Sequence, residues 1–496
     1  MNSLIHPFDP DRHEKFLSDE SWRRGRAHSI SFPADEAALR QVVKQICTYK
    51  RPVTVQGSRT GIAGNAVPGA GHILNLSAMN RITGMAVTAA GGYCLRVQPG
   101  VLLADLNRQT ASRRFEHAGR WDPASINALA RFQDEDPGWF WPPDPTEDAA
   151  SVGGMAATDA RGICACFYGT ARQHIQAVRF VDPRGRVHAV ARGQYRADPA
   201  SRPLPWRNFE ETQTPSDPNE APDLLDLLLG SDGRIGVISE VTLRLRPVPP
   251  QMWGILFFFT GLSQAAGFTD FLASKKGPES GTWIAGVALM DPVTLDAIDT
   301  LKNEVSAFRH LPRIPEKAAG AVYLELHGDR ESAVADLAQE AMDAAADFGC
   351  DPEDTRAATS VADLPRVRLF RQAAPRAVDH LAARARQSDH RLVRLGTDLV
   401  LSGAPLADQI RRYQADMAQA GIPGAIFGHG SDRHLHVTLL PENLGQFVKG
   451  DALIRQWAGR FREQGGRLPA YSGWQARIKN VLDPDNRWQP GSLPDA

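Results

Sequence analysis

Apolar and polar positions repeat with two different periods along this chain, and together they predict a mixed protein of helices and strands. Within residues 31–57, an acidic start at Asp35 and Glu36 precedes apolar side chains at helical spacing, so we expect a helix there. The apolar positions are Leu39, Val42, Val43 and Ile46. Residues 52–56 form a short apolar run, typical of a strand, which leads directly into a stretch of small residues at 57–71. A second short strand is expected at 72–76, so the N-terminal part begins as helix, strand, loop and strand.

The middle of the chain and its C-terminal half continue this alternation. Residues 237–246 alternate apolar and polar side chains as a strand should, and two consecutive prolines at 249–250 close this region. Beyond them, strand-like segments alternate with Ala-rich helical ones such as 331–348, which predicts an α+β domain. Two segments rich in Pro, Asp and Trp, near 118–148 and 190–223, have no stable period and are expected to be irregular insertions.

The charge balance and the cysteine content restrict the function classes. Lys and Arg total 56 against 57 Asp and Glu, so the chain lacks the basic excess typical of a nucleic-acid-binding protein. Its 5 scattered cysteines favour a reducing cytoplasm over a disulfide framework. The longest apolar stretch, 253–259, is too short to span a bilayer, and the polar N-terminus lacks a signal-peptide core. We expect a cytoplasmic protein without a transmembrane segment; peripheral attachment at the inner membrane face is an alternative.

The first candidate motif is the small-residue stretch that begins at Gln56 and ends at Pro68. Residues without bulky side chains let successive backbone N–H groups converge on a diphosphate. The spacing of Gly57, Gly61 and Gly64 does not match a Rossmann G-x-G-x-x-G turn, and no P-loop pattern occurs in the chain. Taken alone, the stretch is equally compatible with an ordinary glycine-rich turn.

Two further small-residue segments follow, at 151–162 and 230–240, and short motifs at 143–145 and 168–170 accompany them. In order and spacing this set resembles the FAD-binding domain of the vanillyl-alcohol oxidase type, also called PCMH-type, over residues 28–250. Within that type it resembles the branch of D-lactate dehydrogenase and the glycolate oxidase flavin subunit.

The resemblance implies a domain organisation. A two-subdomain FAD-binding domain of the PCMH type is expected at 28–250, after an N-terminal extension at 1–27. An α+β cap domain with a central antiparallel sheet is expected at 251–496, where it would contribute the substrate site.

The resemblance also implies which residues bind FAD. Residues 57–61 would embrace the pyrophosphate, 153–154 and 158–162 would line the flavin and its phosphates, and Ile238 would lie against the isoalloxazine edge. Thr60 stands where covalent members have a histidine, so FAD is expected to be bound non-covalently. The implied cofactor-binding residues are Gln56, Gly57, Ser58, Arg59, Thr60, Gly61, Ala66, Val67, Asp144, Ser151, Val152, Gly153, Gly154, Thr158, Asp159, Gly162, Gly236, Val237 and Ile238.

Several positions depart from the family pattern. Ser58, Arg59 and Arg161 replace glycines, Asp159 replaces an asparagine, and Asp232 replaces a glutamate. These changes put bulk or charge beside the expected cofactor. Arg59 could pair with a phosphate, whereas Arg161 could crowd it.

A fourth motif, at 427–441, contains the histidines His429, His434 and His436. On a strand, His434 and His436 point to the same face, and converging neutral imidazoles can bind a metal. A strand whose histidines are merely half-buried is the alternative. The motif is similar to the family's G-H-x-G-D-x-x-L-H, whose first and last histidines hold a divalent ion in metal-dependent members. The resemblance therefore assigns His429 and His436 to zinc or another divalent metal.

The C-terminal end departs from the family. Tyr471 and Ser472 stand where the family has the glutamate that completes the metal site and the histidine favoured as base. Two histidines without that carboxylate make a weaker metal site. The chain ends at 483–491 with a segment similar to the family's D-P-x-x-x-x-N-P-G, with Gln489 in place of the asparagine.

The implied function is that of an FAD-dependent dehydrogenase, which oxidises a D-lactate-like D-2-hydroxy acid by hydride transfer to flavin N5. A neutral histidine suits the base that accepts the hydroxyl proton, and His434 or His429 is the remaining candidate. Arg371 or Arg394 could hold the substrate carboxylate, although each is equally compatible with a surface or core-edge arginine.

The reduced flavin must pass its electrons on. The sequence has no nicotinamide motif, haem motif or cysteine cluster, so we expect an external protein or quinone as acceptor. The resemblance implies an iron–sulfur or other electron-transfer partner. The lost Glu–His pair favours an alternative, a non-catalytic or electron-transfer paralogue within a multi-subunit oxidoreductase. A flavin-free binding module is a third hypothesis.

Overall fold

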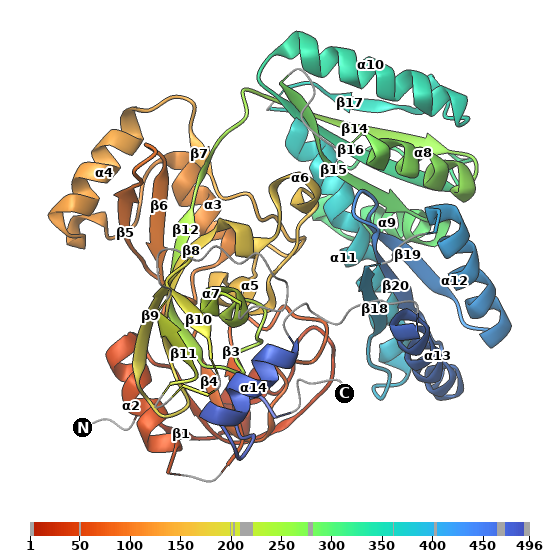
Figure 1. The fold of residues 1–496 in the computed structure, drawn as a ribbon. Coiled ribbons are helices and arrows are strands. Elements are labelled where there is room, and N and C mark those ends of the chain that lie inside the picture. The colour runs from red at the N-terminus through yellow and green to blue at the C-terminus, as the bar shows by residue number, and fades with distance from the viewer. Residues whose placement is uncertain are drawn as a thin grey trace. The chain divides into compact units, whose positions relative to one another are not determined.

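The computed structural model describes residues 4–48, 51–198, 200–201, 204–208, 222–275, 281–360, 362–400, 404–463 and 472–490. The chain divides into two compact units (Figure 1). The first unit comprises Met1–Arg161, Gly169–Val248 and Pro469–Ala496, and the second comprises Gly162–Tyr168 and Pro249–Leu468. Both units combine helices with antiparallel sheets, so the α+β prediction is confirmed.

Two segments lie in a different unit from the one that the expected sequence ranges imply. Residues 162–168 pack on the second unit, where a Cβ added to Gly286 would lie 2.8 Å from Ile163 Cγ1. Residues 472–490 return to the first unit, where Trp488 is buried in an apolar cluster with the helix at 36–46. Both placements depend on contacts between residues distant in sequence, which a local pattern does not report.

The first unit contains two main sheets and several short helices. Its elements are β1 (His6–Pro7), α1 (Pro10–His13), η1 (Glu14–Leu17), β2 (Arg26–Ser31), α2 (Glu36–Ile46), β3 (Val53–Gln56), β4 (Gly69–Asn75), β5 (Ile82–Val87), β6 (Tyr93–Val97), α3 (Leu103–Ser112), η2 (Ala118–Arg120), α4 (Pro123–Asp134), β7 (Trp139–Phe140), α5 (Val152–Thr158), η3 (Ala171–His174), β8 (Ile175–Val181), β9 (Val187–Ala191), β10 (Tyr195–Ala197), β11 (Trp206–Asn208), α7 (Leu224–Leu228), β12 (Val237–Arg244), β13 (Arg246–Pro247) and α14 (Ser472–Leu482).

A four-stranded sheet in the order β1-β2-β4-β3 carries the first glycine-rich loop. β2, β4 and β3 run parallel, so the loop that connects β3 to β4 leaves the carboxyl end of β3. The predicted helix is confirmed as α2, whose first turn is capped by the Asp35 side chain, an acceptor for Ala38 N at 2.8 Å. Its apolar face is fully buried against this sheet and against β8 and β12 of the second sheet.

The second sheet of this unit has the order β5-β6-β12-β8-β9 and is antiparallel throughout. The predicted strand at 237–246 is observed as β12, the central strand, at 237–244. Its apolar positions face the largest cluster of the unit, together with side chains from α3, α4, α5 and α7.

The expectation that residues 118–148 are irregular is wrong, because helix α4 occupies 123–134. Pro123 fixes the first helical turn, and the Asp122 side chain accepts a hydrogen bond from Ser125 N at 2.9 Å. Phe132 anchors the helix edge-on against Tyr93, with ring centroids 5.1 Å apart. Only Ser125, Ala128 and Phe132 are buried on this helix, so its apolar period is weak in the sequence.

The other expected insertion, 190–223, contains a small hairpin. β10 pairs with β11, so the segment is not irregular throughout. Trp206 is buried there against Phe180 and His188. Residues 209–221 of this insertion lie outside the described residues.

The second unit is a seven-stranded antiparallel sheet in the order β17-β14-β16-β15-β19-β20-β18, covered by helices on both faces (Figure 1). One face packs against α8, α10, α12 and α13, and the other against α9, α11 and the α6 segment. The elements are α6 (Ala165–Tyr168), β14 (Gln251–Phe259), α8 (Leu262–Ser274), β15 (Thr282–Met290), α9 (Pro292–Glu304), η4 (Ser306–Phe308), β16 (Gly320–Gly328), α10 (Glu331–Asp347), η5 (Pro352–Asp354), β17 (Arg356–Ala358), α11 (Leu364–Ser388), β18 (Leu395–Val400), α12 (Leu406–Ala420), β19 (Gly424–His429), β20 (His434–Leu439) and α13 (Leu444–Glu463).

The five cysteines are free thiols, as their scattered positions predict. Among the helices of the described residues, none is both long and apolar enough to cross a lipid bilayer.

Candidate functional site

The glycine-rich loop after β3 meets the N-terminal end of α5. A Cβ added to Gly57 would lie 2.2 Å from the Ser151 hydroxyl, so any larger residue would displace this hydroxyl from its position. That hydroxyl is a hydrogen-bond acceptor for Gly154 N at 3.3 Å, as the cap of α5, and lies 3.4 Å from Ser58 N. One serine oxygen therefore joins the first motif to the second, as expected for two segments of one site.

The backbone of the loop is open for a ligand at its centre. Within the described part of the chain, the N–H groups of Thr60 and Gly61 donate no hydrogen bond. A Cβ added to Gly61 would meet nothing within 4 Å. Accessible N–H groups on a backbone without bulky side chains are suitable donors to a phosphate.

Arg59 adopts a conformation that explains the glycine of the family pattern. Its φ is +65°, a left-handed value that glycine adopts without a steric penalty. Its guanidinium lies 4.8 Å from the Phe16 ring centroid and donates to the Lys15 carbonyl. The side chain is thus engaged with the N-terminal segment, whereas we expected that it could pair with a phosphate.

The ends of the loop are fixed by Gln56 and by the residues around Ala66. Gln56 is buried, and its Nε2 donates to the carbonyls of Phe16 at 2.8 Å and Ala66 at 2.7 Å. Ala66 N donates to Asp19 Oδ2 at 3.2 Å, and Val67 N donates to the Gly64 carbonyl. These contacts fix the positions of residues 56 and 66–67, which lie on either side of the open part of the loop.

Helix α5 is packed closely against a neighbouring turn. Gly153 N donates to the Pro99 carbonyl, and a Cβ on Gly153 would overlap Pro99. Val152 is fully buried in the core of the unit. Gly153 therefore allows the two backbones to approach closely. At the exposed end of the helix, Thr158 Oγ1 donates to the Gly154 carbonyl at 3.0 Å.

The charge of Asp159 is neutralised inside the protein. Its carboxylate accepts from Thr170 Oγ1 at 2.7 Å and from Arg172 Nε at 2.9 Å, and Arg172 also bonds to the carbonyl of Leu229. Asp159 also has a left-handed φ of +53° as the C-cap of α5. The aspartate that replaces the family asparagine is thus balanced by Arg172, and Arg161 next to it is exposed.

The third motif docks on the other end of α5. Gly230 N donates to the Ala156 carbonyl at 3.1 Å, and Asp232 N to the Ala157 carbonyl at 2.8 Å. Asp232 pairs with Arg234 at 2.8 Å, and burial raises the pKa of this carboxyl while Arg234 and Asn65 oppose the rise. The three motifs, distant in sequence, therefore surround one short helix.

The remaining residues that the resemblance assigns to FAD binding are less accessible than the glycine-rich loop. Asp144 is half-buried in the loop before α5. Gly236, Val237 and Ile238 begin β12, where Val237 and Ile238 pair with Val181 and Phe180 and are buried in the core. Gly162 groups with the second unit instead of the first.

The first unit fits a phosphate-bearing dinucleotide. Its motifs converge, and the Thr60 and Gly61 N–H groups donate no hydrogen bond to any residue that the structure describes. Side chains at Gly57 and Gly153 would overlap Ser151 and Pro99 of the neighbouring segments. The dinucleotide expected here is FAD, whose pyrophosphate needs such donors.

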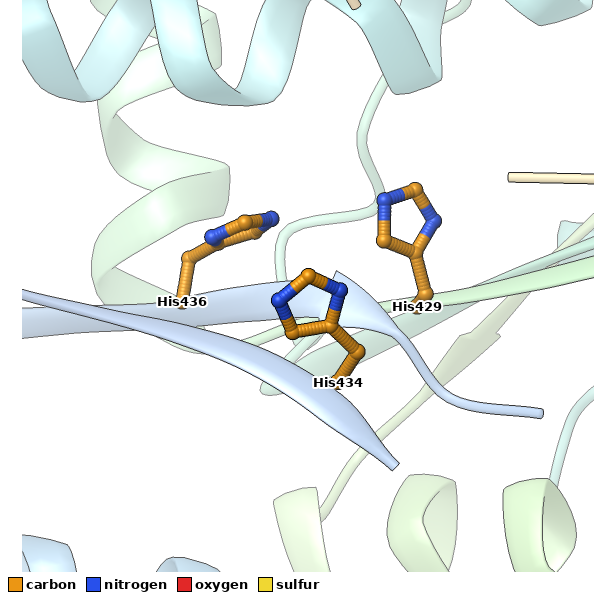
Figure 2. A group of neighbouring side chains, drawn as sticks. All are labelled: His429, His434 and His436. Atoms are coloured by element: carbon orange, nitrogen blue, oxygen red, sulfur yellow. The ribbon is translucent and has the colours of Figure 1, made fainter. Parts of the chain in front are cut away.

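In the second unit, the three histidines lie on one face of the β19–β20 hairpin (Figure 2). His429 and His434 are paired across the two strands, and His436 follows two residues later, as the period of a strand predicts. Their ring centroids are 5.0–5.8 Å apart, and one nitrogen of each lies within 4.8 Å of the others. His429 and His434 are buried, and His436 is half-buried.

This cluster fits a metal better than the two expected histidines alone. Zinc–nitrogen bonds of about 2.0–2.1 Å place tetrahedral ligand atoms roughly 3.4 Å apart. The observed separations of up to 4.8 Å can close by small ring rotations. His434 is thus a third candidate ligand, whereas Tyr471, which stands at the family's glutamate position, lies outside the described residues.

The two arginines proposed for a substrate carboxylate differ in their surroundings. Arg394 is engaged with Asp379, with Nη1 and Oδ1 2.7 Å apart, so its charge is already balanced. Arg371 is buried on α11. Arg371 and Arg394 are both kept as candidates for the substrate carboxylate.

Sequence reasoning missed a buried polar network in the second unit, on the face of the seven-stranded sheet that also carries the three histidines. Glu325 receives hydrogen bonds from Tyr323, from Arg368 Nε at 3.0 Å and from His327 Nε2 at 2.9 Å, and His327 Nδ1 accepts from Tyr168 at 2.8 Å. Burial alone would raise the pKa of Glu325, but Arg368 and His327 outweigh it and hold this pKa well below its usual range. The period-2 placement of Tyr323, Glu325 and His327 in an otherwise apolar strand was a signal that could have revealed it.

Glu325→Gln is expected to lower the free energy of unfolding by about 2–3 kcal/mol, the cost of leaving a largely buried arginine unpaired, reduced because Arg368 is partly exposed. The stabilisation is present above the ordinary carboxyl pKa and is lost as the pH falls, because the folded pKa is the lower one. Denaturant unfolding at neutral pH measures the loss. Glu304→Gln is the control, since exposed Glu304 pairs with His380 and Arg384 and should change little. Equal effects of the two substitutions would contradict this account.

Two family models match the chain. Residues 27–129 and 124–191 match the FAD binding domain, and residues 255–468 match the C-terminal domain of FAD linked oxidases. The first match contains the glycine-rich loop and α5, and the second contains the histidine hairpin and Glu325. FAD is therefore the cofactor, and the chain is an FAD-linked oxidoreductase.

Known proteins and a solved structure are similar to this chain over most of its length. The chain is 24% identical over 507 residues to a D-lactate dehydrogenase of Anaerostipes hadrus, covering 97% of this chain and 92% of the relative. It is 23% identical to the glycolate oxidase subunit GlcD of Bacillus subtilis, covering 90% and 85% of the two chains. The fold is similar to that of alkyldihydroxyacetonephosphate synthase, with a TM-score of 0.63 at 13% identity over 99% of this chain and 84% of that one. The chain thus belongs to the FAD-linked oxidases, and its similarity to D-lactate dehydrogenase and to a glycolate oxidase subunit is consistent with the vanillyl-alcohol oxidase type.

Proposed function

We propose that this protein is a dehydrogenase that oxidises a D-2-hydroxy acid similar to D-lactate and passes the electrons to a protein or quinone acceptor. The observation that carries the proposal is the cluster of three histidines on the sheet of the FAD-linked oxidase domain. Relatives named D-lactate dehydrogenase, each covering most of this chain, support the same substrate class.

The residues of the cap suit the two demands of this reaction. Oxidation removes the hydroxyl proton of the substrate, and a neutral imidazole of His434 or His429 can accept it at physiological pH. The substrate carboxylate needs a cation, and the guanidinium of Arg371 or Arg394 would supply one with a planar, bidentate donor set. Bound FAD supplies the acceptor for the hydrogen on the substrate's C2.

A divalent metal is part of the proposal. His429, His434 and His436 would hold it, and it would supply a Lewis acid for the oxygens of the substrate. A histidine cannot be ligand and base through the same nitrogen. The metal-loaded and metal-free forms of the cluster are therefore alternatives for the way in which the hydroxyl is activated.

Zinc uptake should depend on all three histidines. His434→Ala is expected to weaken zinc binding by more than about 100-fold, because losing a direct ligand should cost more than losing a supporting residue. A competition titration against a chromophoric chelator measures the affinity, with His380→Ala as a control histidine on the surface. Zinc affinity that is the same in wild type and His434→Ala would remove His434 from the site.

A second candidate is an electron-transfer subunit that does not itself oxidise a hydroxy acid. The observation that favours it is the replacement of the family's glutamate and histidine by Tyr471 and Ser472. This subunit would act with a second flavoprotein or an iron–sulfur protein. Copurification with such a partner, together with an unreactive flavin, would support it.

Anaerobic titration of the flavin distinguishes the two functions. Under the first proposal, the visible flavin absorption is bleached by one of D-lactate, glycolate, D-malate and D-2-hydroxyglutarate, and the L enantiomers have no such effect. Dithionite is the control that shows the flavin is reducible. A flavin that dithionite reduces and no hydroxy acid reduces would overturn the first proposal.

A further inference from the structure

The C-terminal segment that returns to the first unit forms a parallel bridge with β3, the strand that leads into the glycine-rich loop. Arg487 and Gln489 exchange hydrogen bonds with Val53 on the free edge of β3, from Val53 N to the Arg487 carbonyl at 2.8 Å and from Gln489 N to the Val53 carbonyl at 2.9 Å. Trp488 between them is 2% exposed, in the cluster that contains α2. Residues 487–489 therefore pair with the edge strand β3, close to where the glycine-rich loop begins.

The side chain of Gln489 joins the two ends of that loop. Its Oε1 accepts from Val55 N at 3.1 Å, and its Nε2 donates to the Asn65 carbonyl at 3.1 Å. Val55 precedes residues 57–64, the glycine-containing part of the loop, and Asn65 follows them. Because Gln489 is buried and its two hydrogen bonds are partly buried, losing this amide would remove hydrogen bonds that water replaces only incompletely.

The same segment also touches the third motif. A Cβ added to Gly233 would lie 3.7 Å from Gln489 Cγ and 3.6 Å from Val55 Cβ, so these three residues are in van der Waals reach. On α14, buried Gln475 donates from Nε2 to the carbonyls of Leu227 at 3.1 Å and Gly230 at 3.2 Å. Gln489 therefore bonds to the backbone on both sides of 57–64 in the first motif, and Gln475 bonds to the backbone at the start of the third motif.

We propose that Gln489 is a positioning residue of the FAD site, which holds the 57–64 loop in its binding shape through Val55 and Asn65. The amide is suited to this because it offers a donor and an acceptor at once, which leucine and glutamate do not. The inference rests on the assignment of this loop to FAD.

The test is the dissociation constant of FAD from the deflavinated full-length protein. Gln489→Leu should raise it by about tenfold or more, because two partly buried backbone groups lose their side-chain partner and the loop loses its shape. Gln489→Asn, which keeps the donor and the acceptor on a shorter side chain, should recover part of the affinity. Trp488→Phe is the control, since it weakens the packing of the same strand and leaves both side-chain hydrogen bonds in place.

A purely structural role would give a different pattern. The unfolding midpoint of the deflavinated protein would fall for Gln489→Leu and Trp488→Phe alike, with the FAD dissociation constant unchanged in both, and this result would overturn the proposal. If Gln489→Leu does not fold, an unchanged constant in Gln489→Glu, which keeps the side-chain length and loses the donor to the Asn65 carbonyl, has the same meaning. If the 57–64 loop does not bind FAD at all, Gly57→Val should leave the FAD dissociation constant unchanged as well. This result distinguishes a wrong loop assignment from a wrong role for Gln489.

Discussion

Gly57→Val is expected to give a folded protein that purifies almost free of FAD. The new side chain would displace the Ser151 hydroxyl, which caps α5 and lies beside Ser58 N, and would separate the glycine-rich loop from α5. Overpacking of this kind costs about 3 kcal/mol, which corresponds to a loss of FAD affinity of roughly 100-fold. The ratio of flavin absorption to protein absorption, followed by titration with FAD, measures the effect.

The control for this prediction is the same substitution at a glycine with open surroundings. Gly119 lies in the first unit, and a Cβ added there meets nothing within 4 Å. Gly119→Val should therefore retain the flavin content of the wild type. Normal flavin content in Gly57→Val would show that the contact between the loop and α5 does not shape the FAD site.

His434→Ala should abolish most of the dehydrogenase activity and leave FAD bound. If His434 accepts the substrate proton, its loss should lower kcat by about 10²–10⁴-fold, the range typical of general base catalysis. If His434 is a metal ligand, kcat should fall as well, and zinc affinity should fall with it. Rapid-mixing measurement of flavin reduction by the active hydroxy acid gives the rate of the chemical step.

Two controls separate these causes. His380→Ala removes a partly exposed histidine that pairs with Glu304, and it should leave the rate of flavin reduction unchanged. Treatment of the wild type with a chelator should reproduce the defect only if a metal takes part. A His434→Ala protein that reduces its flavin at the wild-type rate would remove this residue from the reaction.

The sequence predicted the elements whose signal is local. Helix α2 has a capped start and a continuous apolar face, and β12 and β14 have clear strand patterns. His434 and His436 were expected on one face because a strand has a period of two, and Figure 2 shows them there with His429. These properties depend on neighbours within a few residues, which a sequence displays directly.

The features that sequence reasoning missed depend on contacts across long separations. Gln489 lies 434 positions from Val55, and Arg368 lies 43 from Glu325, so no local pattern connects the members of either pair. Arg59 was expected near a phosphate because of its charge, but its contact with Phe16 involves an N-terminal segment whose position the pattern did not reveal. Helix α4 was missed because it buries few apolar residues.

The central claim is that the motifs around α5 hold FAD without a covalent bond. Its most direct test is to denature the purified, full-length protein and to identify the flavin in the supernatant and in the precipitate by mass. The account predicts a yellow protein that releases intact FAD, close to one molecule per chain, into the supernatant. A colourless protein that does not take up added FAD, or a flavin that remains attached to the precipitated chain, would contradict it.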